Sequence, residues 1–231
     1  MSPTIILVRH AQALHNDYTI PDPELSVLGR AQCNSLKENL VPRITGPNPE
    51  LEVGLIIVSP MRRTIETALL AFGDLGIPME AHAGWQENSI QPCDTGSPVA
   101  ALRSEFPQVN FDLVDPVYPD KTSPAGKKYF NSKQAIMARG QEVLKDLKRR
   151  KENAIIVVSH SGFLRAGVTG RWYMNADYRV FDFVDDSEEK EGELVKIKER
   201  DWTVKEGGLG WSFEEAVELG DGLSDEEPAL N

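Results

Sequence analysis

The sequence predicts an α/β fold, a three-layer sandwich in which helices flank a central, mostly parallel sheet. Three short apolar runs, at residues 4–8, 55–58 and 154–158, are continuously hydrophobic and rich in β-branched residues, as in strands buried on both faces. Segments with helical spacing of apolar residues follow each run, and this alternation favours such a sandwich. A length of 231 residues suits one domain with a substantial core.

The first strand, at residues 4–8, places His10 just beyond its carboxyl end. A helix is then predicted from Ser26, a suitable N-cap, to about residue 41, because Pro42 follows. Apolar or small side chains recur along it at helical spacing, at Leu28, Ala31, Leu36 and Leu40.

The second strand is predicted at residues 55–59. Ser59 and Pro60 then have the pattern of an N-cap followed by a proline in the first turn, which places Arg62 in the first turn of a helix. One face of this helix is apolar, through Met61, Ile65, Ala68, Leu69 and Phe72.

An insert at about residues 73–130 follows, rich in Pro, Gly and Asp, with one short predicted helix at 98–106. We expect this insert to shape the site. The chain then returns to the regular pattern, with a helix at 131–150, the third strand at 154–158, a helical stretch to about 168, and strands near 180–184 and 193–197. His160, like His10, lies just past a strand end.

The formal net charge of −11 is unevenly distributed, because residues 206–231 contain eight acidic side chains and no Lys or Arg. We therefore predict a single domain over residues 1–205 and an acidic, mobile tail over residues 206–231. A nucleic-acid partner is disfavoured, since it requires a concentrated basic face. An anionic small substrate fits if a few arginines gather in one pocket.

No apolar run approaches the roughly 18–20 residues of a membrane helix, and the N-terminal residues show no secretory signal. We therefore expect a cytoplasmic protein with no membrane partner. The two cysteines, Cys33 and Cys93, lie in no metal-ligand or CxxC pattern, which disfavours structural zinc and a disulfide framework.

A set of short motifs follows the strand ends in a fixed order. Arg9-His10 follows the first strand, Ser59-Pro60-Met61-Arg62 opens a helix that continues to Thr67-Ala68, and Ser159-His160-Ser161-Gly162 follows the third strand. With Asn16, Glu87 and the element Leu25-Ser26-Val27-Leu28-Gly29-Arg30-Ala31-Gln32, this pattern resembles the histidine phosphatase superfamily, which also contains the cofactor-dependent phosphoglycerate mutases. The resemblance spans residues 4 to about 168, roughly 70% of the chain, and implies a phosphoglycerate mutase-like sandwich.

The resemblance implies that His10 attacks phosphorus and becomes phosphohistidine, while His160 hydrogen-bonds the transferred group. Guanidinium groups match the charged oxygens of a phosphoryl group, so Arg9 and Arg62 are the predicted phosphate ligands, with Asn16 as a further one. Unprotonated imidazole needs no metal to act as a nucleophile, so neither a metal nor another cofactor is expected.

Two departures from the family pattern bear on the activity. Ala11 stands where the commonest motif has glycine, so the loop must adopt an ordinary backbone conformation. The residues around Glu87 lack the longer substrate-binding pattern of the mutases, which favours hydrolysis. The leading prediction is a metal-independent phosphatase acting on a small phosphorylated metabolite. Phosphoglycerate mutase-type transfer and an inactive phosphate-binding module are the alternatives, and a homodimer is left open.

The predicted proton donor to the leaving group is Glu87, which resembles the family's insert glutamate in its position and its Gln-Glu context. Asp94 is the rival, and its alternative interpretation is a turn aspartate that accepts backbone hydrogen bonds. Aromatic residues of the insert could either line an apolar wall of the site or belong to the core: Trp85, Phe106, Phe111, Tyr118 and Tyr129.

Overall fold

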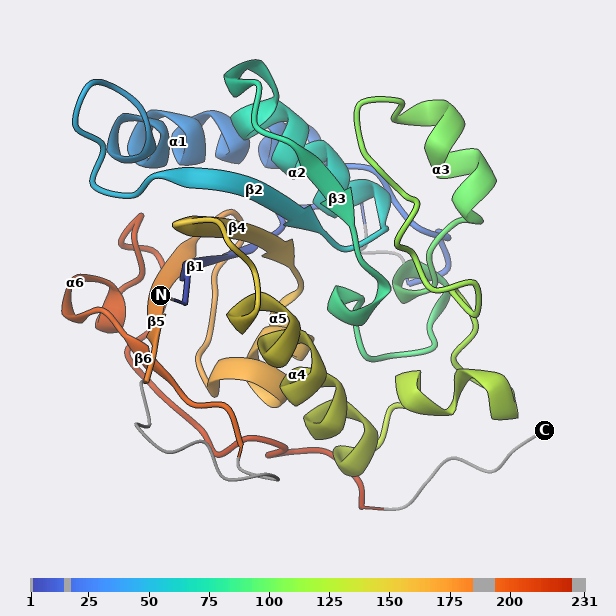
Figure 1. The fold of residues 1–231 in the computed structure, drawn as a ribbon. Coiled ribbons are helices and arrows are strands. Elements are labelled where there is room, and N and C mark those ends of the chain that lie inside the picture. Colours follow the sequence, from blue (N-terminus) through green and yellow to red (C-terminus); the bar gives the residue numbers. More distant parts are fainter. Residues whose placement is uncertain (1, 15–17, 185–193, 226–231) are drawn as a thin grey trace.

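The computed structural model describes residues 2–14, 18–184 and 194–225. Their six-stranded sheet has the order β3-β2-β4-β1-β5-β6, and helices cover both of its faces (Figure 1). The strands are β1 (Thr4–Arg9), β2 (Val53–Val58), β3 (Met79–Ala81), β4 (Ala154–Ser159), β5 (Tyr178–Phe183) and β6 (Ile197–Glu199). Neighbours from β3 to β1 are parallel, whereas β5 and β6 are antiparallel, so the predicted mostly parallel sandwich is confirmed.

The helices divide between the two faces of the sheet, with α1 and α2 on one side and α4 and α5 on the other (Figure 1). Their bounds are α1 (Val27–Ile44), α2 (Arg62–Phe72), α3 (Val99–Glu105), α4 (Lys133–Lys148), α5 (Ser161–Phe163) and α6 (Asp201–Val204). α5 continues into a π-helical segment, Leu164–Thr169. Short 3-10 turns lie at Gly73–Leu75, Ala83–Trp85, Pro92–Asp94 and Pro124–Tyr129.

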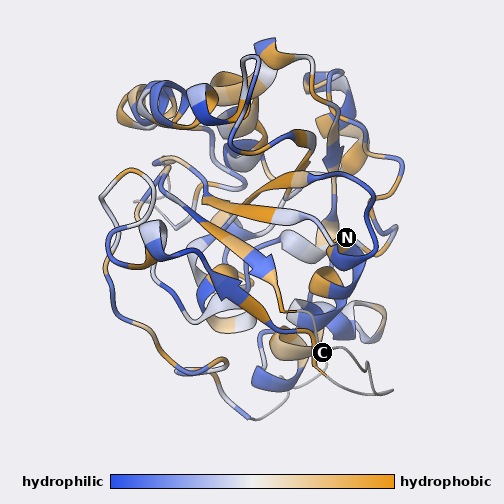
Figure 2. Ribbon diagram, turned by 60° about the vertical axis from the view of Figure 1, so that its left-hand side comes forward, coloured by the Kyte–Doolittle hydropathy of each residue, from blue (hydrophilic) through white to orange (hydrophobic). Residues whose placement is uncertain are grey.

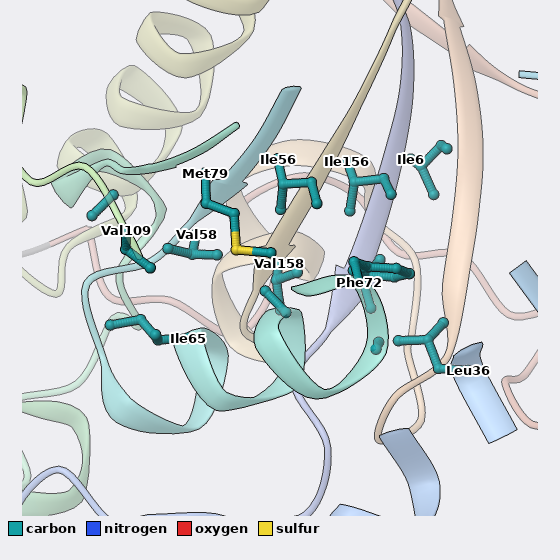
Figure 3. Packing of buried hydrophobic residues seen from close by; sticks show 14 of the residues in the cluster. Ile6, Leu36, Ile56, Val58, Ile65, Phe72, Met79, Val109, Ile156 and Val158 are labelled. Atoms are coloured by element: carbon teal, nitrogen blue, oxygen red, sulfur yellow. The ribbon is translucent and has the colours of Figure 1, made fainter. Parts of the chain in front are cut away.

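Successive side chains of the central strands enter two cores, one on each face of the sheet. Ile6, Ile56 and Ile156 pack on the face covered by α1 and α2, where Phe72 and Leu36 meet them (Figure 3). Their chain neighbours Ile5, Ile57 and Ile155 belong to the core on the α4 side. In Figure 2 the central strands are mainly hydrophobic, whereas hydrophilic and hydrophobic residues alternate along the helices.

The parallel register brings three strand ends to one edge of the sheet. Arg9 pairs with Ser159, and Val58 pairs with Val158. The residues that follow these strands are therefore neighbours: His10 N donates to Ser159 O at 2.9 Å, and Ser59 N donates to Val158 O at 3.0 Å. The carboxyl edge of a parallel sheet is where such folds place ligands.

Two helix boundaries differ from those predicted. α1 continues past Pro42 to Ile44, because a proline in the last turn removes one backbone hydrogen bond without ending the helix. α2 begins at Arg62 with Met61, not Ser59, at its N-cap. The Ser59 hydroxyl is engaged elsewhere, with His160.

The insert begins later than predicted, since residues 79–81 form β3 and pair with β2. A three-residue strand is too short to show periodicity in a sequence. The bounds of the last two strands differ by one to four residues from the predicted ones, and residue 193 lies outside the described residues. The aromatic residues of the insert are all buried, so they belong to the core: Trp85, Phe106, Phe111, Tyr118 and Tyr129.

Residues 206–225, here called the C-terminal strap, pack against the body of the protein, in contrast to the mobile tail predicted from their charge. Ser212 is buried and donates to the buried carboxylate of Asp177 at 2.7 Å. Further along, Gly220 N donates to Ala166 O at 2.8 Å. The acidic side chains of the strap lie mainly at the surface, so composition alone suggested a solvated segment. Within the described residues, no helix is both long and apolar enough to cross a membrane.

Candidate active site

His10 follows β1 and is 4% exposed. Its Nδ1 lies 2.7 Å from the carbonyl oxygen of Ala11, and because a carbonyl only accepts, Nδ1 carries the proton. The lone pair is then on Nε2, to which Arg63 Nε donates at 3.2 Å. Both contacts require the same tautomer, with Nε2 as the nucleophilic atom.

His160 follows β4 and is completely buried. Its Nδ1 accepts from Arg63 Nη2 at 3.1 Å, and its Nε2 donates to Ser59 Oγ at 2.9 Å. Burial, together with the nearby charge of Arg63, lowers the pKa of His160 well below its ordinary value. The ring is therefore neutral near pH 7. It stands edge-on to His10, with 5.1 Å between ring centroids.

Arg63 connects the two histidines to the insert, although the sequence analysis did not single it out. Beyond its bonds to both imidazoles, its Nη1 donates to Cys93 O at 2.6 Å and its Nη2 to Asp94 Oδ1 at 2.9 Å. Thr67 belongs to one of the sequence motifs and lies one helical turn after Arg63, so it indicates which face of the helix is turned to the site. In the structure, Thr67 accepts from Ala11 N at 3.0 Å. The face of α2 that carries Thr67 therefore also carries the arginine of the site.

Arg62 lies in the first turn of α2, as predicted, but its guanidinium contacts the insert and neither histidine. Its Nε donates to Glu105 Oε2 at 2.9 Å, and its Nη1 donates to Ser97 Oγ at 2.7 Å, so the insert holds this guanidinium. One residue advances about 100° around a helix, which turns Arg62 towards the insert and Arg63 towards the strand ends. We therefore replace Arg62 by Arg63 as the candidate phosphate ligand.

Arg9, at the end of β1, is half-buried, and its Nη1 donates to Tyr173 O at 2.8 Å. Its Nε has no hydrogen-bond partner within the described residues. Burial lowers the pKa of Arg9, and the charge of Glu87 opposes this effect while that of Arg63 adds to it. Two partly or fully buried guanidinium groups beside neutral imidazoles suit a dianionic group such as a phosphoryl group.

The two candidate proton donors occupy different environments. Asp94 accepts from Arg63 through Oδ1 and from Ser89 Oγ through Oδ2 at 2.6 Å, so it orients the arginine. Glu87 accepts from backbone N–H groups, of Asn88 at 2.9 Å and of Gly162 at 3.1 Å. Both residues line a cavity of about 210 Å³, whose wall also includes strap residues: Asp221, Gly222 and Leu223.

Asn16 lies outside the described residues, so its predicted contact with phosphate stays a prediction. The described part of the chain contains no group of three or more His, Cys, Asp or Glu side chains arranged to hold a metal ion.

Comparison with known proteins agrees with this geometry. The model of the histidine phosphatase superfamily (branch 1) matches residues 5–180. A phosphoglycerate mutase-like protein of Arabidopsis thaliana is 31% identical over 203 residues, covering 70% of this chain and 72% of its own length. A probable phosphatase of Schizosaccharomyces pombe is 30% identical over 173 residues, covering 70% of this chain and 76% of its own length.

Solved structures show the same fold at low identity. A mycobacterial glucosyl-3-phosphoglycerate phosphatase in complex with VO3 is 18% identical, with a TM-score of 0.52, and the match covers 86% of this chain and 98% of that one. A phosphoserine phosphatase of Entamoeba histolytica has a TM-score of 0.50 at 20% identity, with 78% and 91% covered. The two histidines at adjacent strand ends, the arginine between them and the family match over residues 5–180 together show that the chain belongs to the histidine phosphatase superfamily, branch 1.

Proposed function

We propose that this protein is a metal-independent phosphatase that hydrolyses a small phosphomonoester through a phosphohistidine on His10. Members of the superfamily are phosphatases or mutases, which supports phosphoryl transfer in general. The observation that carries the proposal is the fixed tautomer of His10, which leaves Nε2 unprotonated beside Arg63 and a neutral His160. When a phosphoryl group binds, the N–H of Arg63 turns from Nε2 to a phosphoryl oxygen and frees the lone pair for attack. A nucleophile with its lone pair already oriented needs no metal-bound water.

In the first step, Nε2 of His10 attacks phosphorus, and the bond between phosphorus and the ester oxygen breaks. Arg9 and Arg63 stabilise the charge on the non-bridging oxygens. His160 hydrogen-bonds the same group once its Nε2–H turns from Ser59 Oγ to a phosphoryl oxygen. The leaving alkoxide takes a proton from Glu87, which we retain as the donor because Asp94 is engaged with Arg63.

In the second step, water attacks the phosphohistidine, gives its proton to Glu87 and releases inorganic phosphate, which restores His10. A mutase would instead return the phosphoryl group to a second hydroxyl of a bound intermediate. The similarity to a plant phosphoglycerate mutase-like protein keeps this alternative under test. The two reactions differ in their product, since only hydrolysis releases phosphate.

The test is to quench turnover of a ³²P-labelled phosphomonoester without acid and to locate the label. Label on His10 of the wild-type protein, none on His10→Ala, and stoichiometric release of phosphate are expected. A His10→Ala variant with near-normal turnover contradicts the nucleophilic role. Label on His10 accompanied by an isomerised phosphate ester, without phosphate release, favours the mutase. Activity should survive EDTA, and vanadate should inhibit it.

A further inference from the structure

Lys121 of the insert is buried, and backbone carbonyl groups surround its ammonium group. The residue is 4% exposed. Its Nζ donates to the carbonyl oxygens of Glu87 at 2.7 Å, Ser89 at 3.0 Å and Asp94 at 2.6 Å. An ammonium group has three N–H donors, so these three acceptors use all of them.

The carbonyls that Lys121 binds belong to the segment that carries both candidate proton donors. Glu87 and Asp94 are the two candidate proton donors, and the same ammonium bonds the main chain of both. Their carboxylates are fixed separately, by Gly162 N and by Arg63. A shift of the main chain between residues 87 and 94 would therefore displace both carboxylates relative to His10.

The loop around Lys121 is itself anchored. Asp120 Oδ1 accepts from Thr122 N at 2.9 Å and from Ser123 N at 3.0 Å, which fixes the turn. Earlier in the loop, the hydroxyl of Tyr118 donates to Pro60 O, just before the helix that carries Arg63. The loop that carries Tyr118 and Lys121 thus joins the segment of the candidate proton donors to the residue before α2.

Burial of a lysine is unfavourable for folding, because its charge is taken out of water. The groups that face it include Glu87 and Asp94 from the bound segment, Arg63 from α2 and Arg139 from α4. Arg139 reaches the same segment, where its Nη2 donates to Asn88 Oδ1 at 2.6 Å. Burial lowers the pKa of Lys121 to about 7, and the charge of Arg139 adds to this effect.

We propose that Lys121 is a positioning residue, which holds the segment of Glu87 and Asp94 so that the leaving group is protonated efficiently. This inference rests on the proposed phosphatase reaction. A loss of positioning should therefore slow esters whose leaving group needs a proton far more than esters whose leaving group does not.

The experiment compares Lys121→Met with the wild type on 2-glycerol phosphate, an alkyl ester, and on p-nitrophenyl phosphate. For Lys121→Met we expect kcat/KM on the alkyl ester to fall by about 10–10²-fold, which is part of the ~10²–10⁴ that a general acid supplies. On the aryl ester we expect kcat/KM to fall by less than about threefold. Lys128→Met is the matched control. Lys128 lies in the same insert but pairs with Asp115 at the surface, so the ratio of the two substrates should not change.

A ratio of the two substrates that Lys121→Met leaves unchanged overturns the positioning role. Release of phosphate by the wild type then still supports the phosphatase proposal. If the wild-type protein hydrolyses neither ester, it is the proposed function that fails. Lys121→Gln keeps two uncharged N–H donors and should give an intermediate ratio, which decides the question if Lys121→Met does not fold.

Discussion

The two adjacent arginines at the start of α2 differ in what their guanidinium groups contact. Arg63 bonds both histidines, whereas Arg62 is held by Glu105 and Ser97. Of these two arginines, only Arg63 can therefore stabilise charge that develops on a phosphoryl group at His10. Removal of one such donor typically costs about 10²–10³ in rate.

We predict that Arg63→Met lowers kcat/KM for p-nitrophenyl phosphate by about 10²–10³-fold. Arg62→Met should lower it by less than about threefold. It should lower the free energy of unfolding by about 1–3 kcal/mol, because Arg62 pairs with the partly exposed Glu105 and, at 3.6 Å, with the buried carboxylate of Asp22. Steady-state kinetics and urea unfolding check both variants. Similar kinetic losses in the two variants would contradict this assignment.

His160 links the stability of the protein to pH. Its pKa is lowered well below its ordinary value of 6.5 in the folded state, so below pH 6.5 the unfolded chain takes up a proton that the folded state does not. The contribution of His160 to the free energy of unfolding is therefore fully present above about pH 6.5 and decreases at lower pH by ~1.4 kcal/mol per pH unit.

We predict that the free energy of unfolding of the wild type falls between pH 7.5 and pH 5 more than that of His160→Gln, which cannot take up this proton. Urea unfolding at both pH values measures the difference. Equal declines in the two proteins would show that His160 does not couple to folding in this range. His82, whose pKa burial also lowers, is present in both proteins and cancels in the comparison.

At the scale of elements, the approach of α1 to the loop after His10 depends on one glycine. A Cβ on Gly29 would lie 2.0 Å from the carbonyl oxygen of Gln12, which is backbone and cannot rotate away. That carbonyl also accepts from Ser26 N at 2.9 Å, so the start of the helix and the loop are fixed to each other.

We predict that Gly29→Ala destabilises the protein by about 2–4 kcal/mol and lowers turnover, because α1 must move away from the loop that orients His10. Gly73→Ala is the control. Gly73 has φ −62° and its nearest neighbour to a Cβ is at 3.7 Å, so its effect should stay within ~0.5 kcal/mol. Urea unfolding and kinetics of both variants provide the measurement, and equal effects would refute the close contact.

The elements most accurately predicted from sequence are those whose residues are apolar without interruption. β1, β2 and β4 are buried on both faces, and this leaves a local signal that also locates His10 and His160 at the strand ends. Local sequence cannot decide whether Arg62 or Arg63 is the phosphate ligand, because the answer depends on how α2 is rotated against the sheet. The N-cap of α2 was misplaced for a similar reason, since the hydroxyl of Ser59 bonds a histidine 101 residues away.

At the scale of the whole molecule, the C-terminal strap is connected to the nucleophile through a buried carboxylate. Asp177 accepts from Leu209 N at 2.8 Å and from Ser212 N at 2.9 Å, as well as from the Ser212 hydroxyl. The preceding residue, Ala176, donates its N–H to the carbonyl oxygens of Arg9 and His10 at 3.1 and 3.3 Å. The strap therefore supports the turn on which the main chain of His10 rests.

Shortening the chain after Gly210 removes Trp211 and Ser212 and leaves the carboxylate of Asp177 buried with three fewer hydrogen bonds. It also removes the carbonyl of Phe213, which accepts from Arg179 Nη2 at 2.6 Å. Loss of partners from a buried charge costs about 3–5 kcal/mol. We therefore predict a loss of stability of this order and a lower turnover per folded molecule, measured by urea unfolding and active-site titration.

A chain that ends at Asp225 keeps every described contact of the strap and serves as the control, which should unfold and turn over like the full-length protein. Ser212→Ala isolates the anchor. It removes one hydroxyl from Asp177, which should cost about 1–3 kcal/mol while the rest of the strap stays in place. If the chain ending at Gly210 unfolds at the same urea concentration as the control and keeps its full turnover, the strap is a passive cover and Asp177 does not transmit its position to His10.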